Sequence, residues 1–142
     1  MKNDISAIGN ALVDTVFKVE HSLISELGLE IDQMTLSSAE EHAPIIDRLI
    51  ASGAETVSDC GGSATNSLVA ASSFGAKCFH TCKVADDQDG IRYLDSIKEA
   101  GIGHKGNMSS ANSIPSGKCL ILVTPDAKRT MTTALNVSSL MD

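Results

Sequence analysis

Segments with the pattern of β-strands alternate with segments that have the pattern of α-helices, and this alternation limits the possible folds. Strand character, meaning β-branched or alternating apolar residues, is found at 4–9, 12–19, 33–36, 56–60, 77–84, 117–123 and 129–134. Helical spacing of apolar residues is found at 22–27, 38–52, 63–74 and 87–100. Because strands joined through helices pair in parallel, we predict an α/β fold with a largely parallel sheet flanked by helices, opened by a buried strand at 4–9.

Polar residues at the expected helix starts support these boundaries. We expect Ser22 to cap the first helix, and Ser37 or Ser38 to cap the second, which carries two glutamates in its first turn. The acidic run 86–90 lacks the ligand spacing of an EF-hand calcium loop. It is therefore interpreted as the capped start of the helix at 87–100.

The later strands are short and polar, and they do not fit inside a buried parallel sheet. The chain after Gly101 is rich in glycine, serine and asparagine, and it leads to strands at 117–123 and 129–134 that a Pro125-Asp126 turn connects. These strands suggest a second, smaller β layer. We predict one domain with this layer as an appendage.

Charge and composition exclude several classes of partner. Eighteen acidic residues outnumber 11 basic ones, which gives a net charge of −7 and argues against a nucleic-acid partner. No run approaches the roughly 18 apolar residues of a membrane span, and no signal peptide is visible, so we expect no membrane partner. The four cysteines have neither zinc-site spacing nor a clear disulfide pattern, so we expect reduced thiols in a cytoplasmic protein.

The first candidate site is the segment 9–14, at the crossing between two expected strands. Asn10 and Asp14 can direct an amide and a carboxylate into a common cleft. A carboxylate accepts hydrogen bonds from two neighbouring hydroxyl groups at once, which suits a sugar diol. The alternative is that Asn10 is an ordinary turn residue and Asp14 a solvated charge.

The second candidate site is the segment 60–66, between an expected strand and a helix of small residues. Gly61 and Gly62 let a ligand approach the backbone, and the amides of the helix N-terminus favour an electronegative group. Asn66 lies in the first turn of that helix. The segment matches neither a Walker A loop nor a dinucleotide-binding fingerprint, and the alternative is a common glycine turn.

Other polar residues give weaker signals. Arg129, on a strand of the second layer, can clamp a ligand, although an ion-paired or solvated arginine is the more frequent case. The four histidines show no metal-ligand spacing, and we predict no metal site in the chain.

Taken together, the two candidate sites resemble the ribokinase-like (PfkB) carbohydrate kinases, in the branch of adenosine kinase-like and bacterial sugar kinases. The resemblance runs along essentially the whole chain. It depends on four segments in the family's order, at 9–14, 61–66, 74–76 and 83–90, and on a later one at 126–131. Leu68 and Ala85 depart from the residues usual in the family signature.

The resemblance implies an ATP-dependent kinase that phosphorylates a primary hydroxyl of a sugar or nucleoside, which is the expected small-molecule partner. It implies a ribokinase-like α/β fold with a small β-sheet lid, whose strands are expected within about 13–37 and 103–134. In substrate binding, Asp14 would hold hydroxyl groups, Gly61 and Gly62 would bring the backbone close, and Asn66 would donate or accept a hydrogen bond. Asn10 would support the pocket, and Arg129 is a possible contact from the lid.

The family's catalytic base lies in a Gly-Ala-Gly-Asp segment that has no counterpart in residues 1–142. The resemblance therefore implies that the base and most of the ATP and magnesium site lie beyond Asp142. We expect this chain to be the N-terminal part of the kinase domain, to contain no catalytic residue and to be inactive alone. Open edges of the lid strands suggest a homodimer.

Two other functions are compatible with parts of the sequence. The chain could be a non-catalytic module that binds a sugar or nucleoside or that promotes oligomerisation. A nucleotide-dependent dehydrogenase is disfavoured, because Gly9 leads into a strand and not into a glycine-rich turn before a helix.

Overall fold

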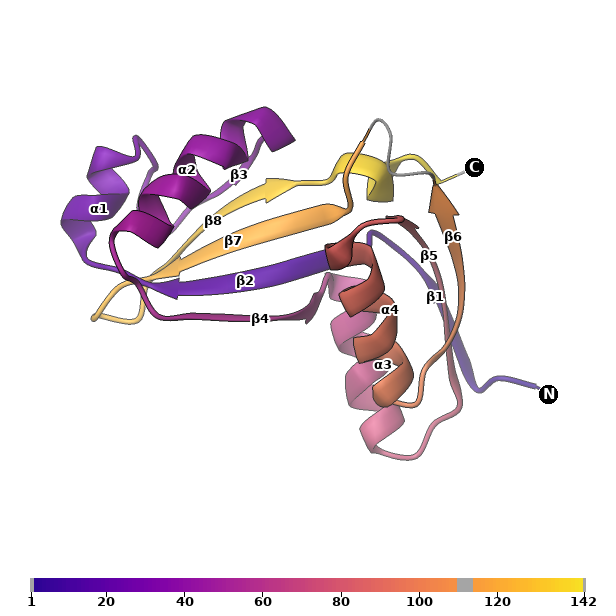
Figure 1. Cartoon of the computed structure of the whole chain (residues 1–142). Helices are drawn as coiled ribbons and strands as arrows, with labels where there is room; N and C mark the ends of the chain where they lie inside the picture. Colours follow the sequence, from indigo (N-terminus) through magenta and orange to yellow (C-terminus); the bar gives the residue numbers. More distant parts are fainter. Residues whose placement is uncertain (1, 110–113, 142) are drawn as a thin grey trace.

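A computed structural model describes residues 2–109 and 114–141 (Figure 1). The strands are β1 Ile5–Ile8, β2 Leu12–Lys18, β3 Met34–Leu36, β4 Thr56–Gly61, β5 Cys78–Ala85, β6 Gly103–Ser109, β7 Gly117–Val123 and β8 Arg129–Ala134. The helices are α1 His21–Glu26, α2 Ala39–Ala51, α3 Ser63–Ser73 and α4 Gln88–Glu99, with a short 3-10 helix η1 at Asn136–Ser139. They form two sheets that meet at an angle (Figure 1).

The first sheet is parallel, with the strand order β1-β5-β6, and α3 and α4 cover one of its faces (Figure 1). Alternate residues of β5 point toward these helices, and Cys78, Cys82 and Val84 are buried there with Tyr93 and Ile97 of α4. The predicted parallel sheet with flanking helices is confirmed.

The second sheet is mixed, with the strand order β3-β8-β7-β2-β4. Its β2 and β7 pair in parallel, whereas β2 with β4 and β7 with β8 pair antiparallel. Helices α1 and α2 lie on one face, where Leu23, Ile24 and Leu49 pack against Phe17 and Leu122 of the sheet. The opposite face carries the other alternate residues of each strand, among them Asp14.

The structure corrects the expected strand assignment at three points. The first strand is not buried: β1 is an edge strand, and the Ile8 side chain is 68% exposed. Strand β6 falls in the range expected for the lid, but it pairs with β5 in the parallel sheet. Strand β4 lies outside both expected lid ranges, but it pairs with β2 in the five-stranded sheet.

The helix starts test the expected caps. Ser38 caps α2 in a capping box, in which its hydroxyl accepts from Glu41 N–H and the Glu41 carboxylate accepts from Ser38 N–H. Asp87 caps α4 by accepting from Gly90 N–H at 2.7 Å, as the acidic run predicts. The Ser22 cap was wrong, because α1 begins at His21 with Glu20 in the cap position and no side-chain cap.

The four cysteines are free, and Cys78, Cys82 and Cys119 are buried, as expected for reduced thiols. Burial raises the pKa of the Cys82 thiol to about 11, which keeps it protonated and unreactive. Within 2–109 and 114–141, none of the helices has the length and apolar character required to cross a membrane.

Candidate functional site

The centre of the candidate site is the Asp14 side chain on β2, which lies over Gly61 of the neighbouring strand β4. Leu12 pairs with Gly61 and Asp14 pairs with Asp59, so the Asp14 carboxyl group stands beside the glycine on the same face. A β-carbon built at position 61 would overlap the carboxyl group of Asp14. Glycine at this position therefore makes room for the carboxylate.

Burial and a second acidic residue determine the electrostatics of Asp14. Its side chain is half-buried, and burial together with the charge of Asp59 raises the pKa of the Asp14 carboxyl above its usual value. Asp59 is exposed, and one of its oxygens accepts from Cys60 N–H at 2.7 Å. A half-buried carboxylate beside a like charge gains from hydrogen-bond donors, and hydroxyl groups of a ligand supply them.

The second glycine forms the turn into α3 and contacts the first candidate segment. Gly62 has φ of +96°, a conformation that glycine adopts without a steric penalty, and it is the N-cap of α3. A β-carbon at Gly62 would lie 2.6 Å from the backbone oxygen of Asn10. The structure thus brings the segments 9–14 and 60–66, far apart in sequence, into contact at the joint between the two sheets.

Asn66 lies in the first turn of α3, where its N–H donates to Gly62 O at 2.9 Å and its side chain is exposed. Thr65, the residue before Asn66, is fully buried and holds the beginning of this helix. The Thr65 hydroxyl forms hydrogen bonds with the Tyr93 hydroxyl at 2.6 Å and with His80 Nε2 at 3.4 Å. Asn66 therefore lies at a helix start that buried hydrogen bonds hold in place, close in sequence to the glycine pair.

Comparison with known proteins identifies the fold and the family. The sequence profile described as pfkB family carbohydrate kinase matches residues 29–142, which is most of the chain.

The chain belongs to the pfkB family of carbohydrate kinases.

Solved structures agree with this assignment. An adenosine kinase from Sinorhizobium meliloti superposes with a TM-score of 0.83 and 29% identity over 99% of the chain and 42% of its own length. A probable sugar kinase from Rhizobium etli CFN 42 gives 0.82 and 26% identity, over 98% of the chain and 41% of its own. Adenosine kinase from Trypanosoma brucei brucei, 20% identical, shares the fold with a TM-score of 0.84 over 99% of the chain and 42% of its own length. This pfkB-family chain spans less than half the length of these structures, and no curated protein sequence matches it.

Arg129, the remaining candidate residue of this pfkB-family chain, lies away from the cluster. It begins β8 and pairs with Val123, whereas the partner of Asp14 on β7 is Cys119, four residues from Val123. Four residues of strand correspond to about 13 Å, and two strand spacings add about 10 Å across the sheet. Arg129 is exposed at the far end of the five-stranded sheet and is not part of the cluster around Asp14.

The register also places in one row with Asp14 several residues that no sequence motif indicates. Asp59, Asp14, Cys119 and Thr133 are consecutive partners across β4, β2, β7 and β8, so they form one row on the face of the sheet opposite α1 and α2. The Thr133 hydroxyl donates to Cys119 Sγ at 3.2 Å. Only the pairing of four strands, which no local motif encodes, brings these residues together.

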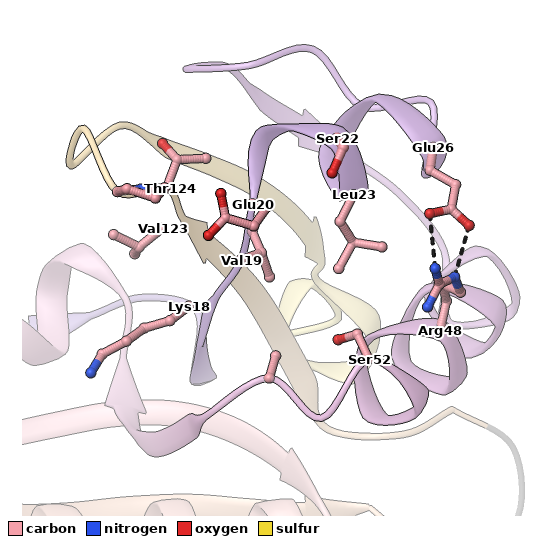
Figure 2. Close-up of a pocket in the computed structure, with 12 residues that line it drawn as sticks. Lys18, Val19, Glu20, Ser22, Leu23, Glu26, Arg48, Ser52, Val123 and Thr124 are labelled. Atoms are coloured by element: carbon pink, nitrogen blue, oxygen red, sulfur yellow. Dashed lines mark hydrogen bonds and ion pairs between the residues drawn. The ribbon is translucent and has the colours of Figure 1, made fainter.

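A cavity of about 500 Å³ lies at the other end of β2 and β7, between α1 and α2 (Figure 2). Its floor is apolar, and its basic residues are already paired. Arg48 forms two hydrogen bonds of 2.9 Å with Glu26, and Lys18 donates to Glu55 at 2.8 Å. Because Asp14 and the glycine pair lie at the opposite end of β2, we place the candidate site of this pfkB-family chain at the joint and not in this cavity.

Among the residues that the structure describes, no group of three or more histidine, cysteine or acidic residues can hold a metal ion. The described residues therefore fit no magnesium site, and we derive no step through ATP or magnesium.

Proposed function

We propose that this chain supplies the substrate-binding part and the lid of an ATP-dependent phosphotransferase that acts on a primary hydroxyl of a sugar or nucleoside. The observation that supports the proposal best is the Asp14 carboxylate over Gly61, beside the start of α3. A half-buried carboxylate can accept from two vicinal hydroxyl groups.

Each residue of the cluster has a proposed role. Asp14 accepts from the ligand's hydroxyl groups, while Gly61 and Gly62 let the ligand lie against the backbone. Asn66 hydrogen-bonds the same ligand from the start of α3, and Asn10 supports the pocket, with its backbone oxygen close to Gly62. We propose no direct role for Arg129, because it lies at the far end of the sheet.

Phosphoryl transfer also requires a residue that positions the acceptor hydroxyl and groups that stabilise charge on the transferred phosphoryl. We propose that these groups, with ATP and magnesium, belong to the remainder of the family fold, since the chain spans about 42% of the adenosine kinase structure it superposes on. We further propose that the five-stranded sheet acts as the lid.

Two properties of the whole protein are also proposals. The four free cysteines support a cytoplasmic location, where thiols stay reduced. The edge strands β3 and β4 of the five-stranded sheet support a homodimer formed through that sheet.

The test is binding of a panel of ligands to the 142-residue chain, measured by isothermal titration calorimetry. The panel consists of adenosine, other nucleosides, ribose, fructose and 2-keto-3-deoxygluconate. We expect one class to bind, and binding to be lost in Asp14→Ala. Phosphorylation of the same ligand by a protein that joins this chain to the remainder of the fold, with ATP and magnesium, separates the kinase from a non-catalytic binding module. Absence of binding across the panel contradicts the proposed site.

A further inference from the structure

A second polar cluster, separate from Asp14, connects the two sheets at their joint. Ser116 immediately precedes β7 and is buried. Its N–H donates to Asp87 Oδ2 at 2.8 Å, and its hydroxyl donates to Asp87 Oδ1 at 2.7 Å. The Ser116 hydroxyl also accepts from Ala85 N–H at 2.9 Å, at the end of β5. Ser116, which leads into the five-stranded sheet, is thus hydrogen-bonded to Ala85 at the end of β5 and to Asp87 just after it, both next to the parallel sheet.

Neighbouring contacts reinforce this connection. Gly90 packs so closely that a β-carbon there would overlap the backbone oxygen of Ala85 and lie 2.8 Å from Ser116 Oγ. Lys118 Nζ forms an ion pair of 2.6 Å with Asp89, and each of these residues lies two positions after Ser116 or Asp87. Asn136 Nδ2 donates to Ser116 O at 3.0 Å, which attaches η1 to the same point.

Ser116 is also close in the sheet register to the candidate site. The residue after it, Gly117, pairs with Leu12, and Asp14 is two residues further along β2. Asn66 belongs to α3, which packs mainly on β1 and β5 of the parallel sheet and also contacts β4. A rotation that carries the parallel sheet and α3 together against the five-stranded sheet therefore changes the separation between Asp14 and Asn66.

We propose that Asp87 and Ser116 are a positioning pair that fixes the angle between the two sheets and thereby the distance between Asp14 and Asn66. The pair does not touch the ligand. Its effect on ligand binding rests on the proposed function, whereas its effect on the angle does not. Burial opposes the charge on Asp87, but the hydrogen bonds from Ser116 and Gly90 prevail and hold the pKa of its carboxyl below the usual value.

Residual dipolar couplings of backbone amides test the angle directly, because they report the orientation of each sheet relative to the other. We expect the couplings of both sheets in the wild-type chain to fit one alignment tensor. Asp87→Asn keeps a residue that caps helices as well as aspartate does. However, its amide cannot accept from both the N–H and the hydroxyl of Ser116 while capping Gly90. We expect this variant to need two different tensors, and Ser116→Ala to behave in the same way.

Ser72→Ala is the matched control, since Ser72 donates to Ala100 O at 2.7 Å within the parallel-sheet side alone. It should retain one tensor. The proposal is overturned if the wild type already needs two tensors, or if both joint variants keep one. It is also overturned if both variants unfold, since the pair would then be required for stability and not for orientation.

Ligand affinity separates this proposal from the proposed function. With the ligand found in the panel, we expect Asp87→Asn to bind about tenfold more weakly, because misplaced groups lose much of their contribution. If Asp87→Asn needs two tensors but binds the ligand with unchanged affinity, the proposal of a positioning pair stands. The proposed site that spans Asp14 and Asn66 is then contradicted. If the joint variants keep one tensor but bind the ligand more weakly, the positioning pair is contradicted and the proposed site is not.

Discussion

The carboxyl group of Asp14 occupies the space that the β-carbon of any residue other than glycine would take at position 61. The two positions are adjacent on antiparallel strands, and the glycine is half of the pair that leads into α3. The side chain proposed to bind the ligand and the turn beside it therefore depend on each other sterically.

Replacing Asp14 separates ligand binding from stability. Asp14→Asn should weaken ligand binding by roughly 10- to 100-fold, because hydrogen bonds to charged groups contribute about 1.5–3 kcal/mol. It should also raise the unfolding temperature at pH 7. Burial and Asp59 raise the pKa of Asp14, so the native state resists ionisation and is less stable above that pKa. Calorimetry and thermal melts measure both effects, with Asp59→Asn as the control that should keep binding. A less stable Asp14→Asn variant would contradict this reasoning.

Substitution of Gly62, the glycine directly before α3, should cost more stability than substitution of a glycine elsewhere with similar backbone geometry. Gly62 has φ of +96° and Gly75 has φ of +91°, but only Gly62 has an atom close to its missing β-carbon. Gly75→Ala should cost about 1 kcal/mol from backbone strain alone. Gly62→Ala should cost about 1–3 kcal/mol more, from its collision with Asn10 O. Urea denaturation measures the difference, and equal losses would show that the contact with Asn10 is unimportant.

Two buried histidines should make the protein sensitive to mild acid. Burial holds the pKa of both His42 and His80 below their usual value. The unfolded chain therefore takes up these protons first, and stability should be complete above about pH 6.5 and decrease as the pH falls below it. Thermal melts from pH 7.5 to 5 measure the effect, which His42→Gln and His80→Gln should each reduce. A profile that both substitutions leave unchanged would assign the acid sensitivity to other groups.

The proposed homodimer makes a prediction for the edge strand β4. Val57 lies on this strand and is 72% exposed. A lysine on an edge strand opposes pairing with another chain, so Val57→Lys should convert a dimer to a monomer in light scattering after size-exclusion chromatography. Ile50→Lys is the control, because Ile50 is similarly exposed but lies on α2, outside any sheet edge. A wild-type chain that is monomeric at high concentration would rule out this dimer.

Features encoded locally were predicted well from the sequence. The Ser38 capping box and the Asp87 cap each need only a few adjacent residues, and both are present. Strand β6 was not recognised because 103–109 lacks apolar alternation and becomes a strand through pairing with β5. The same limit explains why the sequence did not predict where Asp59 and Arg129 lie. Their positions relative to Asp14 follow from the pairing of β2 with β4 and of β7 with β8, which is non-local.

The chain passes between the two sheets three times, at β1 to β2, at β4 to α3 and β5, and at β6 to β7. Neither sheet is therefore a continuous piece of sequence. A protease cut in the middle passage, between β4 and β5, would leave both sheets with strands on each fragment. A cut in the first passage would remove β1 from the parallel sheet, and a cut in the last would remove β7 and β8 from the five-stranded sheet. No single cut therefore divides the chain into its two sheets. The same threading implies that the two sheets unfold together.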